Sequence, residues 1–226
     1  MIRGVIFDKD GTLFDFHASW GAWAAGFLAS LGGDTAALAR AIAFNPDTGR
    51  FAPQSPAIAG TPAQIADALL PHLPHMTRPD LLAVMNRSAA AAQMIAAVPL
   101  ADLLDGLRAH GLCLGLVTND AEAPARAHLG RHAIIDRFDF IAGFDSGFGA
   151  KPQAGQLLAF CAATGLDPEA VVMVGDSTHD LHAGRIAGMA TIGVLTGPAL
   201  REELQPLADA VLDHIGQLPA WLAEKT

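Results

Sequence analysis

Val5-Ile6-Phe7-Asp8-Lys9-Asp10-Gly11-Thr12-Leu13 is the stretch that decides the fold of this chain. Residues 2–7 form a short apolar run, with Arg3 as its one charged residue, which is typical of a strand buried on both faces. Asp8 and Asp10 follow this run two residues apart, so they lie on the same side of the chain. Because crowded carboxylates repel each other unless a metal ion or a proton intervenes, the stretch predicts a functional site rather than a surface turn.

The composition predicts a folded protein with a sizeable core. Hydrophobic residues make up 51% of the chain and charged residues 16%, a balance that argues against disorder. The net charge of −9 argues against nucleic acid and against an anionic membrane surface as partners. Two cysteines in apolar segments predict buried, reduced thiols. The first strand leaves no room for a signal peptide, so we expect a cytoplasmic protein without a membrane span.

The periodicity after the first strand divides the chain into two kinds of structure. Residues 15–98 show no strand alternation, and their spacing predicts helices at 16–31, 35–44, 61–70 and 78–97, with a loop rich in glycine and proline at 45–60. From Leu100 onward, helices alternate with short apolar strands at 112–117, 138–142, 171–174, 191–195 and 210–212. This alternation is typical of a doubly wound parallel sheet. We therefore predict an α/β core, residues 1–14 and 99–226, with an inserted helical domain at 15–98.

Open α/β sheets bind ligands at the carboxyl ends of their strands, so the residues after each strand are site candidates. Thr118-Asn119-Asp120 offers a hydroxyl, an amide and a helix start, which suit either a phosphate oxygen or ordinary helix capping. Lys151-Pro152 follows a glycine-rich loop in a chain where lysine is scarce. Gly175-Asp176-Ser177-Thr178-His179-Asp180 again places carboxylates after an apolar strand.

These segments resemble, in order and spacing, the motifs of the haloacid dehalogenase superfamily of aspartyl phosphotransferases. The matching residues are D-x-D-G-T at Asp8–Thr12, Thr118, Lys151-Pro152, and G-D-x-x-x-D at Gly175–Asp180. The helical insert is similar to the type-1 cap of the superfamily, and residues 138–152 and 45–61 resemble its phosphoglycolate phosphatase-like branch. Lys9 departs from the pattern, which usually has an apolar or aromatic residue there, and we expect it to point away from the two carboxylates.

The resemblance implies a Mg²⁺-dependent phosphatase that acts on a small phosphorylated metabolite. Asp8 is then the nucleophile that becomes an aspartyl phosphate, and Asp10 is the general acid and base. The implied Mg²⁺ ligands are Asp8, Asp10 through its backbone carbonyl, and Asp176, with support from Asp180. The implied phosphate-binding residues are Thr118, Asn119 and Lys151.

The same residues also bear on other functions of this fold. Asp10 argues against a dehalogenase, and the absence of lysine from residues 15–98 argues against phosphonate hydrolases and sugar-phosphate mutases, which use a cap lysine. A phospho-accepting or a non-catalytic binding protein on the same fold is the alternative. Arg50, in the predicted loop, is the residue we expect to recognise a small acid such as phosphoglycolate, although a solvated arginine is an equal explanation. We expect Trp20 to pack inside the helical insert.

Overall fold

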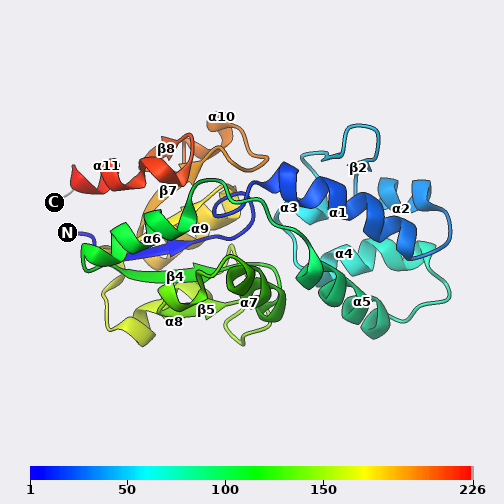
Figure 1. The fold of residues 1–226 in the computed structure, drawn as a ribbon, viewed down its shortest axis with the longest axis horizontal. Coiled ribbons are helices and arrows are strands. Elements are labelled where there is room, and N and C mark those ends of the chain that lie inside the picture. The colour runs from blue at the N-terminus through cyan, green and yellow to red at the C-terminus, as the bar shows by residue number, and fades with distance from the viewer. Residues whose placement is uncertain (225–226) are drawn as a thin grey trace.

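The computed structural model describes residues 1–224, which fold around a parallel sheet of six strands in the order β5-β4-β1-β6-β7-β8 (Figure 1). The strands are β1 (Gly4–Phe7), β4 (Cys113–Val117), β5 (Phe140–Ala142), β6 (Val171–Gly175), β7 (Ala190–Val194) and β8 (Ala210–Leu212). β1 is central and pairs in parallel with β4 on one side and β6 on the other. The predicted doubly wound sheet is confirmed, with strand ends that differ by at most two residues from the predicted ones.

Helices cover both faces of the sheet because successive side chains of β1 point in opposite directions. Val5 and Phe7 pack with the apolar sides of α6 (Leu100–Ala109), α7 (Glu122–Arg131) and α11 (Leu218–Ala223). Ile6 packs on the other face with α8 (Gly155–Thr164) and α9 (Thr178–Ala187). The remaining core helix is the short α10 (Arg201–Leu204). All strands therefore present their carboxyl ends at the same edge, beside the inserted part.

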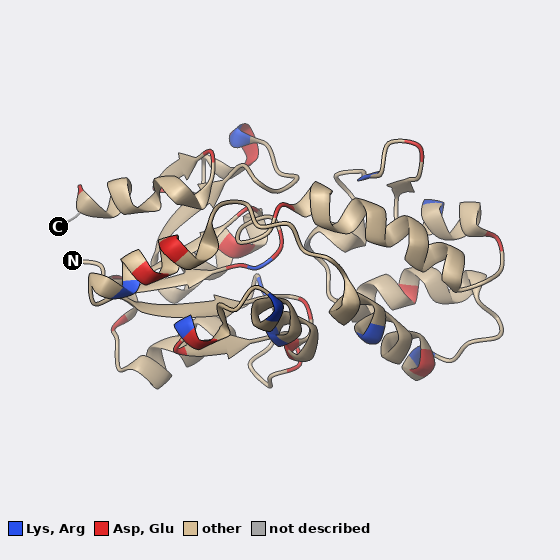
Figure 2. Ribbon diagram, viewed as in Figure 1, with Lys and Arg blue, Asp and Glu red and all other residues tan. Residues whose placement is uncertain are grey.

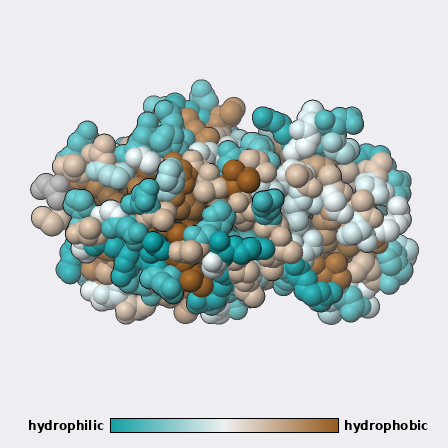
Figure 3. Space-filling model, in the orientation of Figure 1, coloured by the Kyte–Doolittle hydropathy of each residue, from teal (hydrophilic) through white to brown (hydrophobic). Residues whose placement is uncertain are grey.

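The inserted part has a hydrophobic core of its own. It contains α1 (Phe16–Ser30), α2 (Thr35–Ala41), α3 (Pro56–Ala59), α4 (Pro62–Leu69) and α5 (Arg78–Ala91). α1 carries no lysine, arginine, aspartate or glutamate along its length (Figure 2). In the space-filling view, the insert and the sheet domain together form one elongated body (Figure 3). No helix within residues 1–224 combines the length and the apolar character needed to cross a bilayer.

Three predicted elements of the insert are wrong in detail. The helix predicted at 35–44 ends at Ala41, because Phe44 belongs to a short hairpin. The predicted loop at 45–60 contains a short antiparallel hairpin, β2 (Phe44–Asn45) with β3 (Arg50–Phe51), and also α3. The predicted helix at 78–97 ends at Ala91. The reason is that the chain returns to the sheet domain there, and backbone hydrogen bonds from Ala97 to Leu13 and from Asp15 to Ile95 replace those of another helical turn.

Candidate active site

Asp8 lies at the carboxyl end of the central strand, 7% exposed, beside the buried ammonium group of Lys151. Lys151 Nζ is 2.5 Å from Asp8 Oδ1 and 2.6 Å from Asp180 Oδ1, so one cation bridges two carboxylates. Burial raises the pKa of Asp8 to about 7, against the opposing charge of Lys151. Burial also disfavours the charge of Lys151, but the nearby carboxylates of Asp180 and Asp8 raise its pKa above the usual value.

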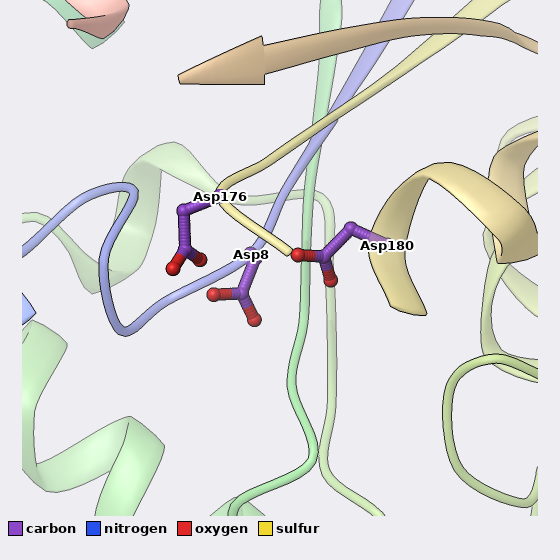
Figure 4. Close-up of side chains that lie close together, drawn as sticks. All are labelled: Asp8, Asp176 and Asp180. Atoms are coloured by element: carbon purple, nitrogen blue, oxygen red, sulfur yellow. The ribbon is translucent and has the colours of Figure 1, made fainter. Parts of the chain in front are cut away.

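Asp8, Asp176 and Asp180 form a buried acidic cluster, which we call the carboxylate cluster (Figure 4). Each contributes an oxygen, and these oxygens lie within 4.8 Å of one another. Burial and then the charges of Asp8 and Asp180 raise the pKa of Asp176 well above its usual value. Three carboxylates with a single ammonium group leave an excess of negative charge. The cluster can therefore hold a divalent cation that prefers oxygen ligands.

Two glycines leave the space that Asp176 occupies. Gly11 turns the chain after β1 with φ of +84°, and a β-carbon there would overlap the Asp176 carboxylate. A β-carbon at Gly197, in the loop that follows β7, would overlap the same carboxylate. Thr196 Oγ1 donates to the carbonyl of Gly11 at 2.6 Å and joins the two loops. The position of Asp176 thus depends on two residues that have no side chain.

Asp180 is held in the first turn of α9 by a reciprocal capping arrangement. Ser177 donates to Asp180 Oδ2 from its backbone N–H at 3.0 Å and from its hydroxyl at 2.7 Å. The other oxygen, Oδ1, faces Lys151. Asp180 therefore orients Lys151 from behind the carboxylate cluster as well as belonging to it.

Asn119 contacts the segment that carries Lys151, and its binding of phosphate stays a prediction. Its side-chain amide pairs with the backbone of Lys151 in both directions, with Nδ2 donating to the carbonyl at 2.9 Å and Oδ1 accepting from the N–H at 2.8 Å. This pairing fixes the backbone that carries the lysine. Thr118 is 2% exposed and its Oγ1 accepts from the N–H of Asp120. Both Thr118 and Asn119 line the cavity described below.

Lys9 does not point away from the carboxylates, and that prediction is wrong. Its side chain is fully buried, and Nζ lies 3.0 Å from Asp10 Oδ2, 2.8 Å from Asp120 Oδ2 and 3.1 Å from His128 Nδ1. The charges of Asp10 and Asp120 raise the pKa of Lys9 although burial opposes it. An ammonium group at this position is stable because two carboxylates surround it.

The Asp10 carboxylate is held by donors on both oxygens. Trp20 Nε1 donates to Oδ1 at 2.8 Å, and Lys9 faces Oδ2. Trp20 belongs to α1 of the insert, so this hydrogen bond joins the insert to the strand ends. Trp20 packs against the core of the insert as predicted, and it is also a site residue, which was not predicted. The carboxylate of Asp10 is not part of the carboxylate cluster, and its backbone carbonyl as a metal ligand stays a prediction.

Side chains of α7, and of His132 directly after it, contact backbone carbonyls at the end of α5 and just beyond it. His128 Nε2 lies 2.8 Å from the Ala89 carbonyl, Arg131 donates to Ala90, and His132 Nε2 lies 3.1 Å from the Met94 carbonyl. Because a carbonyl only accepts, His128 Nε2 carries the hydrogen and Nδ1 accepts from Lys9. Burial, reinforced by the positive charge of Lys9, lowers the pKa of His128 to about 4, which keeps the ring neutral.

A cavity of about 100 Å³ lies between the strand ends and the insert. The catalytic candidates Asp8, Asp10 and Lys151 line one side. The insert contributes mainly apolar side chains, among them Phe16, Trp20, Trp23, Phe51, Ile65 and Met85. His179 also lines the cavity. Arg50, at the outer hairpin, is exposed and does not belong to the lining of this cavity.

The residues that sequence reasoning missed are Trp20, His128 and Gly197. Trp20 offered a partial signal, since it closely follows the first motif in the sequence. Lys9 also offered a partial signal, because an unusual charge beside two carboxylates needs a buried partner. Nothing local in the sequence distinguishes His128 or Gly197, because their contacts are with residues far away along the chain.

The chain matches known proteins over most of its length. The model of the haloacid dehalogenase-like hydrolases matches residues 5–194. A phosphoglycolate phosphatase of Rhodospirillum rubrum is 35% identical over 121 residues, which are 53% of this chain and 50% of that protein. A phosphoglycolate phosphatase of Chromobacterium violaceum is 38% identical over 117 residues, 52% of each protein. The match thus spans about half the length of these curated relatives.

Solved structures share the fold. The crystal structure of a predicted phosphoglycolate phosphatase from Haemophilus somnus has a TM-score of 0.71 at 19% identity, with 98% of each chain covered. A β-phosphoglucomutase from Clostridium difficile has a TM-score of 0.72 at 20% identity, covering 100% of this chain and 97% of that one. Both proteins therefore share the fold of this chain over nearly its whole length.

Proposed function

The chain belongs to the haloacid dehalogenase-like hydrolase family, and we propose that it is a Mg²⁺-dependent phosphatase that hydrolyses a small phosphomonoester through a phosphorylated Asp8. The observation that carries the proposal is the position of Asp8 at the central strand end, where Lys151 and the carboxylate cluster face the same cavity. The names of the two relatives, both phosphoglycolate phosphatases, support phosphomonoester hydrolysis.

In the first step, an oxygen of Asp8 attacks phosphorus and the bond from phosphorus to the ester oxygen breaks. Asp10 gives a proton to that oxygen, which leaves as an alcohol. In the second step, the Asp10 carboxylate takes a proton from water while the water oxygen attacks phosphorus and the bond to Asp8 breaks. Asp8 and inorganic phosphate are then both free. The contacts of Lys9 and Trp20 with Asp10 orient its carboxylate for both transfers.

Electrostatics explain why this site needs a metal ion. A phosphate dianion would join three carboxylates that only Lys151 offsets, and like charges 4 Å apart repel by about 4 kcal/mol at an effective dielectric near 20. The hard oxygen donors of Asp8, Asp176 and Asp180 fit Mg²⁺. Burial, and then the charges of the neighbouring carboxylates, raise the pKa of Asp8 and of Asp176, and a bound cation would favour their charged forms. Bound Mg²⁺ would stabilise the charge that develops on the transferred phosphoryl group.

Other residues have supporting roles in the proposal. Thr118 and Lys151 bind the phosphoryl oxygens, while Asn119 holds the backbone of Lys151. Residues 15–98 act as a cap over a core formed by residues 1–14 and 99–226. Recognition of a substrate carboxylate by Arg50 stays a prediction, which the exposed position of that residue does not support. Cys161 is buried as predicted, Cys113 is only partly buried, and both are free thiols. The cytoplasmic location stays a prediction.

Phosphate release from p-nitrophenyl phosphate tests the function. Wild type should turn over with Mg²⁺, stop in EDTA and recover when Mg²⁺ is restored. Asp8→Asn should fold, as judged by circular dichroism, and lose essentially all turnover. Full turnover in EDTA would contradict the metal, and near wild-type rates in Asp8→Asn would contradict the nucleophile. Binding of phosphate esters without release by wild type would favour the non-catalytic alternative.

A further inference from the structure

We propose that the substrate is a phosphomonoester of a small, neutral, apolar alcohol, alkyl or aryl, rather than a phosphorylated acid. This inference rests on the phosphatase function proposed above and concerns the part of the substrate that leaves. The phosphoryl group faces the strand ends, so the leaving group must occupy the side of the cavity that the insert provides.

The insert side of the cavity is an aromatic wall. The rings of Phe16 and Phe51 pack edge to face with centroids 5.8 Å apart, and those of Trp20 and Trp23 at 4.9 Å. Met85 and Ile65, from α5 and α4, continue this surface. The cavity, at about 100 Å³, far exceeds the roughly 10–15 Å³ that one water needs. It therefore has room for a group beyond the phosphoryl oxygens, with apolar contacts on its insert side.

The charges of the cavity argue against a second anion on the substrate. Among the described residues that line it, Lys151 is the only lysine or arginine, and Asp8 and Asp180 already flank it. The other charged lining groups are carboxylates, including Asp120 and Asp176. A substrate carboxylate would lose its hydration among these groups, and apart from the imidazole of His179 the described lining offers it no further basic side chain, which makes its burial costly. Asn86 is the polar side chain on the insert side, and it suits a neutral group.

The wall is part of the site rather than an isolated packing defect. Trp20 lines the cavity and at the same time donates to Asp10, so a leaving group that contacts the tryptophan lies next to the proposed acid. Apolar pockets with a few converging polar groups are the usual form of small-molecule sites. The same side chain thus connects recognition of the leaving group with the carboxylate that protonates it.

A series of n-alkyl phosphates tests the inference, because methyl, propyl and butyl phosphate differ in apolar area while their leaving groups have nearly equal basicity. With wild-type enzyme and Mg²⁺, kcat/KM should rise by about fourfold for each methylene that enters the cavity. Phosphoglycolate should be at least about tenfold poorer than propyl phosphate, which has a leaving group of similar size. Benzyl phosphate should rank with butyl phosphate or above it.

Two variants separate the wall from general stability. Ile65→Ala should lower kcat/KM for butyl phosphate by about tenfold and leave methyl phosphate within about twofold. Leu82→Ala removes a similar side chain that packs in the insert without lining the cavity, and should preserve the wild-type ranking. A preference for phosphoglycolate over every alkyl ester, or kcat/KM values that do not depend on chain length, would overturn the inference about the leaving group. Turnover of p-nitrophenyl phosphate in the same experiment would still support the phosphatase function. Absence of phosphate release from every ester would overturn both.

Discussion

Replacing Lys9 by methionine keeps most of the length of the side chain and removes the ammonium group from a fully buried position. The ammonium group is 3.0 Å from Asp10 and 2.8 Å from Asp120, whose side chains are only 17% and 12% exposed. Lys9→Met leaves both carboxylates without their cation, and loss of one partner of a buried ion pair costs about 3–5 kcal/mol. At about 2–4 °C per kcal/mol for a chain of this size, the melting temperature should fall by roughly 6–20 °C.

Thermal unfolding followed by circular dichroism at neutral pH measures this loss. Arg78→Met is the matched control, because Arg78 and Asp67 form an exposed pair whose removal should move the melting temperature little. Turnover should also fall in Lys9→Met, since Asp10 loses one of its two orienting donors. A variant that melts within about 2 °C of wild type and keeps full turnover would refute the view that Lys9 holds these carboxylates.

Three further expectations concern the same edge of the sheet. Gly197→Ala should displace the Asp176 carboxylate and weaken activation by Mg²⁺ about 10- to 100-fold, as measured by titrating activity with Mg²⁺. Gly106→Ala is the control, because a β-carbon there meets open space and should leave the activation unchanged. Equal behaviour of the two variants would contradict the overlap between a β-carbon at position 197 and Asp176. Burial raises the pKa of Asp8 from 3.8 to about 7, so between these two pH values Asp8 is more protonated in the folded state than in the unfolded state. The contribution of Asp8 to the free energy of unfolding therefore falls as the pH rises from 3.8 to about 7. In EDTA, Asp8→Asn should therefore gain melting temperature over wild type from pH 5 to pH 8, and a constant difference would speak against the shift. Asp10→Asn should slow propyl phosphate by about 10²- to 10⁴-fold and p-nitrophenyl phosphate much less, because p-nitrophenolate leaves without a proton; equal slowing of both esters would remove Asp10 as the acid.

The sheet and its strand-end residues could be predicted because their signals are local. The strand before Asp8 is a continuous apolar run, and the strands at Cys113–Val117 and Val171–Gly175 have the same character. Parallel strands bring their carboxyl ends together whatever the intervening sequence does. The parallel sheet therefore predicted that Asp8, Lys151 and Asp180 lie at one edge, and the resemblance to the family motifs implied that they form one site.

The errors lie where contacts between distant residues decide the outcome. Lys9 is 111 positions from Asp120 and 119 positions from His128 in the sequence, so the residues next to Lys9 do not identify these two partners. The alanine-rich stretch after Ala91 has high helix propensity, but the return to the sheet domain ends the helix there. Arg50 was selected because it lies in a loop, and an exposed hairpin is equally compatible with that sequence.

The hydrogen bond from Trp20 to Asp10 links the position of the insert to the orientation of the proposed acid. The insert is attached to the sheet domain at more than one place, through this bond and through the contacts of His128 and Arg131 with the carbonyls of Ala89 and Ala90. Separation of α1 from the strand ends would break the bond of Trp20 and remove one of the two donors on Asp10, while the contacts of α7 need not change. Asp10 therefore has both of its donors only while α1 lies against the strand ends.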